Sequence, residues 1–115
     1  MRRPRPIMKA AVGLVGTALI ASPVLAGPAV ATRWAETKLP QADCLERAEW
    51  AIKRSGFGRI ERTEQSRYGT HDGYTAAIRC IVDNSVVFFI VSGPERGESD
   101  GLAGLLYKNF QVDPA

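Results

Sequence analysis

The stretch Tyr74–Ser92, "YTAAIRCIVDNSVVFFIVS", decides the fold because it encodes two apolar strands around a turn. Asp83 and Asn84 interrupt two runs rich in β-branched and aromatic residues, which is the pattern of a β-hairpin. If these two residues form the loop, Cys80 lies opposite Val87. Alternation along the strands then divides the hairpin into two faces.

One face of this hairpin is almost wholly apolar, and we expect it to pack against helices. Its burial would remove a large apolar surface from water and so form the centre of a core. The residues expected on this face are Tyr74, Ala76, Ile78, Cys80, Val82, Val87, Phe89 and Val91.

The opposite face is also rich in apolar side chains, and it is our candidate partner surface. Exposed apolar patches of this kind mark interaction sites unless something covers them. The cover could be an irregular N-terminal arm over residues 32–42, a second copy of the chain, or a partner. The candidate residues on this face are Arg79, Ile81, Val86, Phe88 and Ile90.

The segment before the hairpin predicts a helix over Asp43–Ser55. Asp43 and Glu46 have the spacing of a capping box, and Gly56 suits a left-handed stop. Trp50 falls on the polar side, either covered by the N-terminal arm or free to contact a partner, and we count it with the candidate partner surface. The apolar positions at helical spacing are Cys44, Leu45, Ala48, Ala51 and Ile52.

Between this helix and the hairpin we expect one charged edge strand, over 59–68. A three-residue loop, His71-Asp72-Gly73 with Gly73 in the left-handed conformation, would join it to the next strand. This loop length would turn Ile60 and Tyr68 toward the helices.

The chain ends in a second helix, firm over Leu102–Phe110 and loose over the preceding "PERGESDG". Gly97, Gly101 and Gly104 each weaken it by about 1 kcal/mol relative to alanine. The predicted fold is therefore α+β. It is a two-layer sandwich in the order helix–β–β–β–helix, with a three-stranded antiparallel meander and both helices on one face.

The first 31 residues have the order of a secretory signal peptide: a basic start, an apolar run and small residues. We expect cleavage after Ala31, where the chain turns polar, with Ala26 as the alternative. The apolar run is shorter than the ~20 residues that span a bilayer, so no stable span is expected after cleavage. The single domain would then cover 32–115, and the protein would be periplasmic or secreted.

Removal of the signal changes the charge balance. The whole chain has 15 basic and 12 acidic residues; cleavage removes four basic ones and leaves 11 and 12, a net charge of −1. A nucleic-acid partner would need a concentrated basic surface, so none is expected. In an exported domain Cys44 and Cys80 are expected to form a disulfide worth about 4 kcal/mol, the alternative being two buried thiols.

Few residues could carry catalysis. His71 is the only histidine, and in a hairpin loop water would surround it. With Asp72 it offers two ligands, fewer than a zinc site requires, so we expect no metal, cofactor or catalytic residue. The carboxylates available to an alternative small hydrolase, all expected on solvated faces, are Glu46, Glu49, Glu61 and Glu64.

Three stretches, "LPQADCLERAEWAIKRSGFG" (39–58), "GYTAAIRC" (73–80) and "VVFFIVSGP" (86–94), resemble small exported proteobacterial proteins of an uncharacterised family. The resemblance implies a helix–three strands–helix domain with one disulfide, Cys44–Cys80, and it brings no catalytic residue.

Taken together, the residues favour an exported, non-catalytic domain that binds a protein or cell-envelope partner, or forms a homodimer. Contact would run through the open sheet face or a hairpin loop such as 67–73. The alternatives are a carboxylate-based hydrolase and a structural or stress-protective envelope protein.

Overall fold

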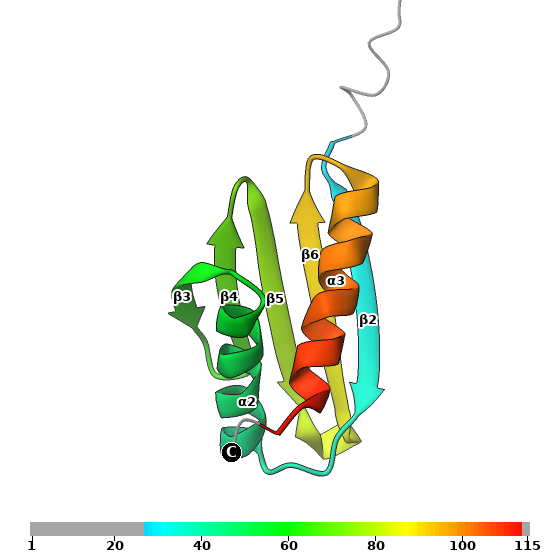
Figure 1. Cartoon of the computed structure of the whole chain (residues 1–115). Coiled ribbons are helices and arrows are strands. Elements are labelled where there is room, and N and C mark those ends of the chain that lie inside the picture. The colour runs from blue at the N-terminus through cyan, green and yellow to red at the C-terminus, as the bar shows by residue number, and fades with distance from the viewer. Residues whose placement is uncertain (1–26, 114–115) are drawn as a thin grey trace, which may run out of the picture.

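The computed structural model describes residues 27–113, which form a five-stranded antiparallel sheet and two α-helices (Figure 1). The strands lie side by side in the order β2-β6-β5-β4-β3. The signal peptide predicted for 1–31 lies outside the described residues except for its last five positions. The elements are β2 (Ala29–Glu36), α2 (Gln41–Arg54), β3 (Gly58–Arg62), β4 (Ser66–His71), β5 (Tyr74–Ile81), a 3₁₀ turn (Val82–Asn84), β6 (Val86–Gly93) and α3 (Arg96–Gln111).

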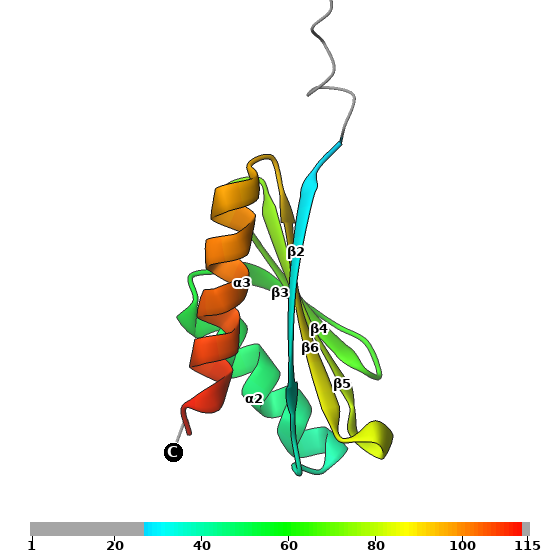
Figure 2. The ribbon, with the colours of Figure 1, turned by 90° about the vertical axis from the view of Figure 1, so that its right-hand side faces the viewer.

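The domain has two layers, with both helices on the same side of the sheet (Figure 2). The α+β class is therefore confirmed. The three-stranded meander is wrong in its strand number, because the described sheet has five strands. The two additional strands come from segments predicted as an irregular arm and as part of a single long strand.

The first additional strand is β2, which includes the last three residues of the predicted signal peptide and the first part of the irregular arm predicted over 32–42. Alanines occupy positions 29, 31 and 35 of "AVATRWAE", so the face of the strand that carries them packs closely under α3. Ala29 and Ala31 point toward α3 and are buried, whereas Trp34 points away and is exposed. All eight residues of β2 pair with β6, which makes the N-terminal segment an edge of the sheet.

The second additional strand arises because the predicted strand 59–68 is a hairpin of β3 and β4. Its turn is closed by two hydrogen bonds: the Thr63 backbone N–H donates to the Ser66 carbonyl, and the Ser66 N–H donates to Thr63 Oγ1, both at 3.0 Å. Threonine and serine side chains offer the backbone such local partners, which favours a turn over a continuous strand.

The loop between β4 and β5 has two residues rather than the three predicted. His71 pairs with Tyr74, and Asp72 and Gly73 turn the chain with φ angles of 51° and 82°, as a type I′ turn requires. The shorter loop reverses the face of Tyr68, which points away from the helices. Ile60 still packs on the core, because the register of β3 shifts between Gly58 and Glu61.

The register of the central hairpin is as predicted, with Cys80 opposite Val87. The loop itself is longer than Asp83-Asn84. Val82–Asn84 form a 3₁₀ turn, and Ser85 reaches a left-handed φ of 57° while its N–H donates to the Val82 carbonyl. A four-residue loop keeps the same parity as a two-residue loop, so the faces of the strands do not change.

Helix α2 begins earlier than predicted, at Gln41, because Pro40 suits the position before the first turn. The capping box is wrong: Asp43 lies inside the first turn and makes no side-chain cap. The predicted stop is confirmed, since Gly56 has a φ of 96° and the Phe57 N–H donates back to the Ile52 carbonyl.

Helix α3 is also longer than predicted and includes the stretch expected to be loose. Its start is fixed by Glu95, whose carboxylate accepts hydrogen bonds from the N–H groups of Gly97 and Glu98. A carboxylate at this position satisfies backbone donors that the helix leaves free. This cap offsets part of the cost of the glycines that follow.

The core lies between the sheet and the helices and is held by one disulfide. The predicted Cys44–Cys80 bond is present and joins α2 to β5. Both cysteines are fully buried among the apolar residues of both layers. The fully buried side chains of this core include Ala48, Ala51, Ile52, Ala76, Ile78, Val87, Phe89, Val91, Ala103 and Leu106.

Gly69 tests how closely α2 packs on the sheet. A β-carbon at this position would lie 2.6 Å from Ile52 Cγ2 and 2.9 Å from Phe57 Cβ, closer than packed carbons approach. We expect Gly69→Ala to reduce the free energy of unfolding in urea by about 1–3 kcal/mol. Gly58→Ala is the control, because nothing lies within 4 Å of its added carbon. Equal stability of the two variants would contradict this packing.

Candidate functional site

The candidate site is the sheet face turned away from the helices, which we call the open face. Cross-strand pairs share a face, so the register assigns its members directly. None of the described residues forms a helix or loop layer over it (Figure 2). Its residues are Val30, Thr32, Trp34 and Glu36 on β2; Val86, Phe88, Ile90 and Ser92 on β6; Thr75, Ala77, Arg79 and Ile81 on β5; Ser66, Tyr68 and Thr70 on β4; and Glu61 on β3.

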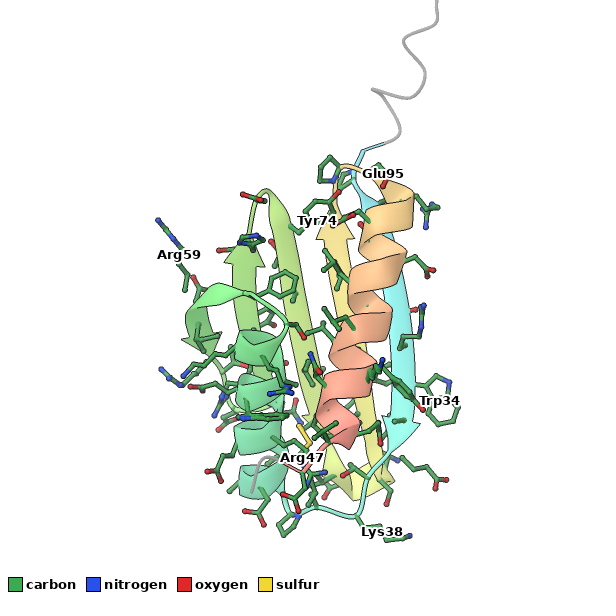
Figure 3. All side chains as sticks on the ribbon, viewed as in Figure 1. Trp34, Lys38, Arg47, Arg59, Tyr74 and Glu95 are labelled. Carbon is green, nitrogen blue, oxygen red and sulfur yellow. A yellow bond between two sulfur atoms is a disulfide. The ribbon has the colours of Figure 1, made fainter. Side chains whose placement is uncertain are left out.

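The centre of the open face is one row that crosses four strands. Trp34 pairs with Phe88, Phe88 pairs with Arg79, and Arg79 pairs with Ser66. The Trp34 side chain is 61% exposed, and Figure 3 shows it at the β2 edge of the sheet. Phe88 is 38% exposed, so two aromatic side chains stand next to each other in contact with water. Single exposed apolar residues are ordinary, but a continuous row is not.

Arg79 is held against the face by two side chains. Its Nη2 donates to Gln65 Oε1 at 2.5 Å, and its Nη1 donates to Ser66 Oγ at 3.3 Å. Ser66 is almost fully buried, which fixes its hydroxyl as a reference point. The guanidinium is therefore oriented beside Phe88 rather than free to extend into solvent.

Five of the six residues predicted for the partner surface lie on the open face: Arg79, Ile81, Val86, Phe88 and Ile90. The exception is Trp50, which lies on the helix side and packs partly against the core. The Arg54 guanidinium lies 5.2 Å from the centre of the Trp50 ring. Trp34 does not cover Trp50, because the two side chains lie on opposite sides of the sheet.

Three members of the open face were not predicted from the sequence: Trp34, Val30 and Tyr68. Trp34 was predicted to lie in the irregular arm and Val30 in the signal peptide, although the alternation in "AVATRWAE" is a strand signal that could have placed both on one face. Tyr68 was turned inward by the wrong loop length. Each omission enlarges the apolar part of the open face.

The helix side carries a cluster of charges centred on Glu49. Arg62 donates to both of its carboxylate oxygens, at 2.9 and 2.8 Å, and Lys53 lies 3.1 Å away. The hydrogen bonds from Arg62 lower the pKa of Glu49 from 4.5 to about 2, against a smaller opposing effect of burial. A carboxyl group with so low a pKa is ionised near neutral pH and makes a poor general acid.

Arg67 lies next to Glu49, between the sheet and α2, and accounts for the position of this cluster. Its side chain is 16% exposed, and its Nη1 donates to the carbonyls of Thr63 and Ser66. Its Nε is buried without a hydrogen bond and lies 3.5 Å from Glu49 Oε1. Glu49 therefore supplies the counter-charge for a buried guanidinium, which is a structural role.

The other predicted carboxylates, Glu46, Glu61 and Glu64, are exposed as expected. Glu64 and Asp83 border a shallow hollow of about 410 Å³ with Gln41, whose amide donates to the Glu64 and Cys80 carbonyls.

His71 lies at the end of β4, one residue before the turn. Its side chain is 62% exposed, and its Nε2 lies 3.4 Å from Asp72 Oδ2. The ring also meets the edge of Phe57 at a centroid distance of 6.4 Å. Across residues 27–113, no three His, Cys, Asp or Glu side chains come together as a metal site. Within the same range no helix is long and apolar enough to cross a membrane.

The segment 67–73, predicted as a hairpin loop that could contact a partner, is mostly strand. Arg67 is packed under α2, and only Asp72 and Gly73 form the turn. A contact made by the tip of this hairpin would therefore be small.

Comparison with protein-family models, with curated proteins and with solved structures finds no match to this chain.

The contribution of Glu49 to stability can be tested by measuring the free energy of unfolding as a function of pH. The folded state lowers the pKa of Glu49, so its stabilising effect is present above pH 4.5 and is lost as the pH falls toward about 2. We expect Glu49→Gln to reduce the free energy of unfolding near pH 7 by about 1–3 kcal/mol, because it removes the counter-charge of Arg67.

The measurement is urea unfolding at several pH values. The difference between the wild type and Glu49→Gln should shrink as the pH falls from 4.5 to 2. Glu46→Gln, an exposed change on the same helix, should match the wild type throughout. A difference for Glu49→Gln that does not change with pH would contradict this account.

Proposed function

We propose that the protein is an exported, non-catalytic binding module that docks another protein on its open face. The observation that carries the proposal is the exposed row Trp34–Phe88–Arg79 across the centre of the sheet. Trp, Phe, Tyr and Arg are enriched at protein–protein contacts and supply most of their binding energy. Tyr68 adds a fourth residue of this kind to the same face.

The positions of the chain's own segments favour a separate molecule as the partner that covers the open face. The N-terminal arm, which was one expected cover, is strand β2 and makes the open face wider. Helix α3 lies on the opposite side of the sheet along its whole length (Figures 1 and 2). Among residues 27–113, the segments able to cover the face are therefore used elsewhere.

The charges on the open face favour a protein over an anionic membrane. Arg79 is the one basic residue that the register of the described strands assigns to it, whereas Glu36 on β2 and Glu61 on β3 carry the opposite sign. Binding to anionic lipid would need several basic residues near the surface. Polar residues such as Thr32, Thr75 and Ser92 alternate with the apolar ones, as in interfaces between proteins that also exist apart.

The edges of the sheet are poor places for a partner to add a strand. At β2, the Val30 carbonyl accepts from Arg96 at 3.3 Å and the Thr32 carbonyl accepts from Arg33 at 3.0 Å. The opposite edge, β3, is short and carries charged side chains, which protect edges from pairing. Contact through the face is therefore favoured over contact through an edge.

The alternative of a carboxylate-based hydrolase has less support. Glu49 is committed to Arg62 and Arg67, and its pKa is lowered rather than raised. A structural or stress-protective role would show itself as self-association, which the following experiment detects.

The test introduces a photo-crosslinking residue at Trp34 in the exported protein, identifies the captured protein, and measures the Kd with both proteins purified. We expect Phe88→Arg to weaken binding by about 30-fold or more, since it removes a central aromatic contact. Leu105→Arg on α3 is the matched control, because Leu105 is also 38% exposed but lies on the other layer. It should leave the Kd within about twofold.

Three outcomes would contradict this proposal. Equal Kd values for the two variants would remove the open face as the site. A crosslink only between two copies, with a dimer in light scattering, would show self-association instead. Binding to neutral phospholipid vesicles that Phe88→Arg abolishes, without any captured protein, would show a lipid surface.

A further inference from the structure

The first residues of β2 are built into the domain. Ala29 and Ala31 are 9% and 6% exposed and lie beneath α3. The hydroxyl of Ser99, fully buried on α3, donates to the Ala29 carbonyl at 3.1 Å. The Arg96 guanidinium donates to the Val30 carbonyl at 3.3 Å. Both layers of the fold therefore hold residues 29–31.

This packing gives a separate reason for the small residues at positions 29 and 31. Helix α3 lies directly over them, and alanine is a small side chain that permits this close approach. The pattern Ala29-Val30-Ala31, which looks like a peptidase site in the sequence, is thus accounted for by the core. The pattern Val24-Leu25-Ala26, which precedes the residues that the structure describes, also fits the rule of small residues at the cleaved bond.

Cleavage after Ala31 would damage the sheet. It would remove three pairs with β6, namely Ala29 with Gly93, Val30 with Ser92 and Ala31 with Val91. The buried Ser99 hydroxyl would lose its acceptor, which is unfavourable for a polar group away from water. The new charged amino terminus would lie at Thr32, directly before Arg33.

We infer that the leader is removed by hydrolysis of the peptide bond between Ala26 and Gly27, so that the mature protein is residues 27–115. Water adds across this bond, leaving a carboxylate on Ala26 and an ammonium group on Gly27. The catalyst is an export peptidase that accepts small residues at the cleaved bond. This processing site replaces the expected cleavage after Ala31 and keeps all eight residues of β2.

The consequence reaches the open face, although the argument for the processing site does not depend on the proposed function. Val30, 49% exposed, stays on the open face only if cleavage precedes it. The new amino terminus, Gly27, borders a hollow of about 630 Å³ that Thr75 and Ser92 also line. The positive charge created by processing thus lies at one end of that face.

The test exports the full-length precursor in a Gram-negative host and measures the intact mass of the purified product. We expect the mass of 27–115 with one disulfide. A mass that begins at Thr32, or an uncleaved precursor in the membrane fraction, would overturn the inference.

A second measurement asks whether residues 27–31 belong to the fold. Deleting them from the precursor joins Ala26 to Thr32 and yields an exported domain without the start of β2. We expect its Tm to fall by about 10 °C, since three strand pairs and the Ser99 hydrogen bond are lost. An unchanged Tm would overturn the structural basis of the inference. Changing Phe88 does not affect either readout, so failure here is distinct from failure of the proposed function.

Discussion

The close packing of both helices on one face of the sheet is the constraint on which the rest of the structure depends. The Cys44–Cys80 disulfide joins α2 to the middle of the sheet, and Gly69 lets the helix approach β4. At the other side, Ala29 and Ala31 let α3 lie over β2. A domain this small buries only a modest core, and its apolar contacts and its disulfide lie between the helices and the sheet.

The same arrangement leaves the second face of the sheet without a layer. Five strands give that face considerable width, and the segment that might have covered it has become β2. Trp34 and Phe88 then stand in contact with water, which is unfavourable unless a partner covers them for part of the protein's life. Several charged groups elsewhere have local partners: Arg67 and Arg62 bind Glu49, and Arg33 pairs with Asp100. We therefore propose the open face as the surface for recognition.

Much of this could be predicted from local patterns, and the errors came from pairings that such patterns do not encode. The faces of the central hairpin follow from strict alternation, and the buried side of α2 follows from helical spacing. The strand at 29–36 was missed because an edge strand depends on a neighbour, β6, that lies far along the chain. Tyr68 was placed on the wrong face because a one-residue difference in loop length reverses every side chain of a strand. The open face could therefore be predicted from the sequence at its centre, but its extension over β2 and β4 could not.

We expect the open face to be uncovered in the isolated protein and covered by a partner in the cell. Hydroxyl-radical footprinting with mass spectrometry, on the purified exported monomer and on intact cells, measures this directly. Trp34 and Phe88 should be labelled in the purified monomer and protected in cells, while the buried Phe89 stays protected in both. Equal labelling of Trp34 and Phe88 in the two settings, or their protection in the isolated monomer, would contradict the account.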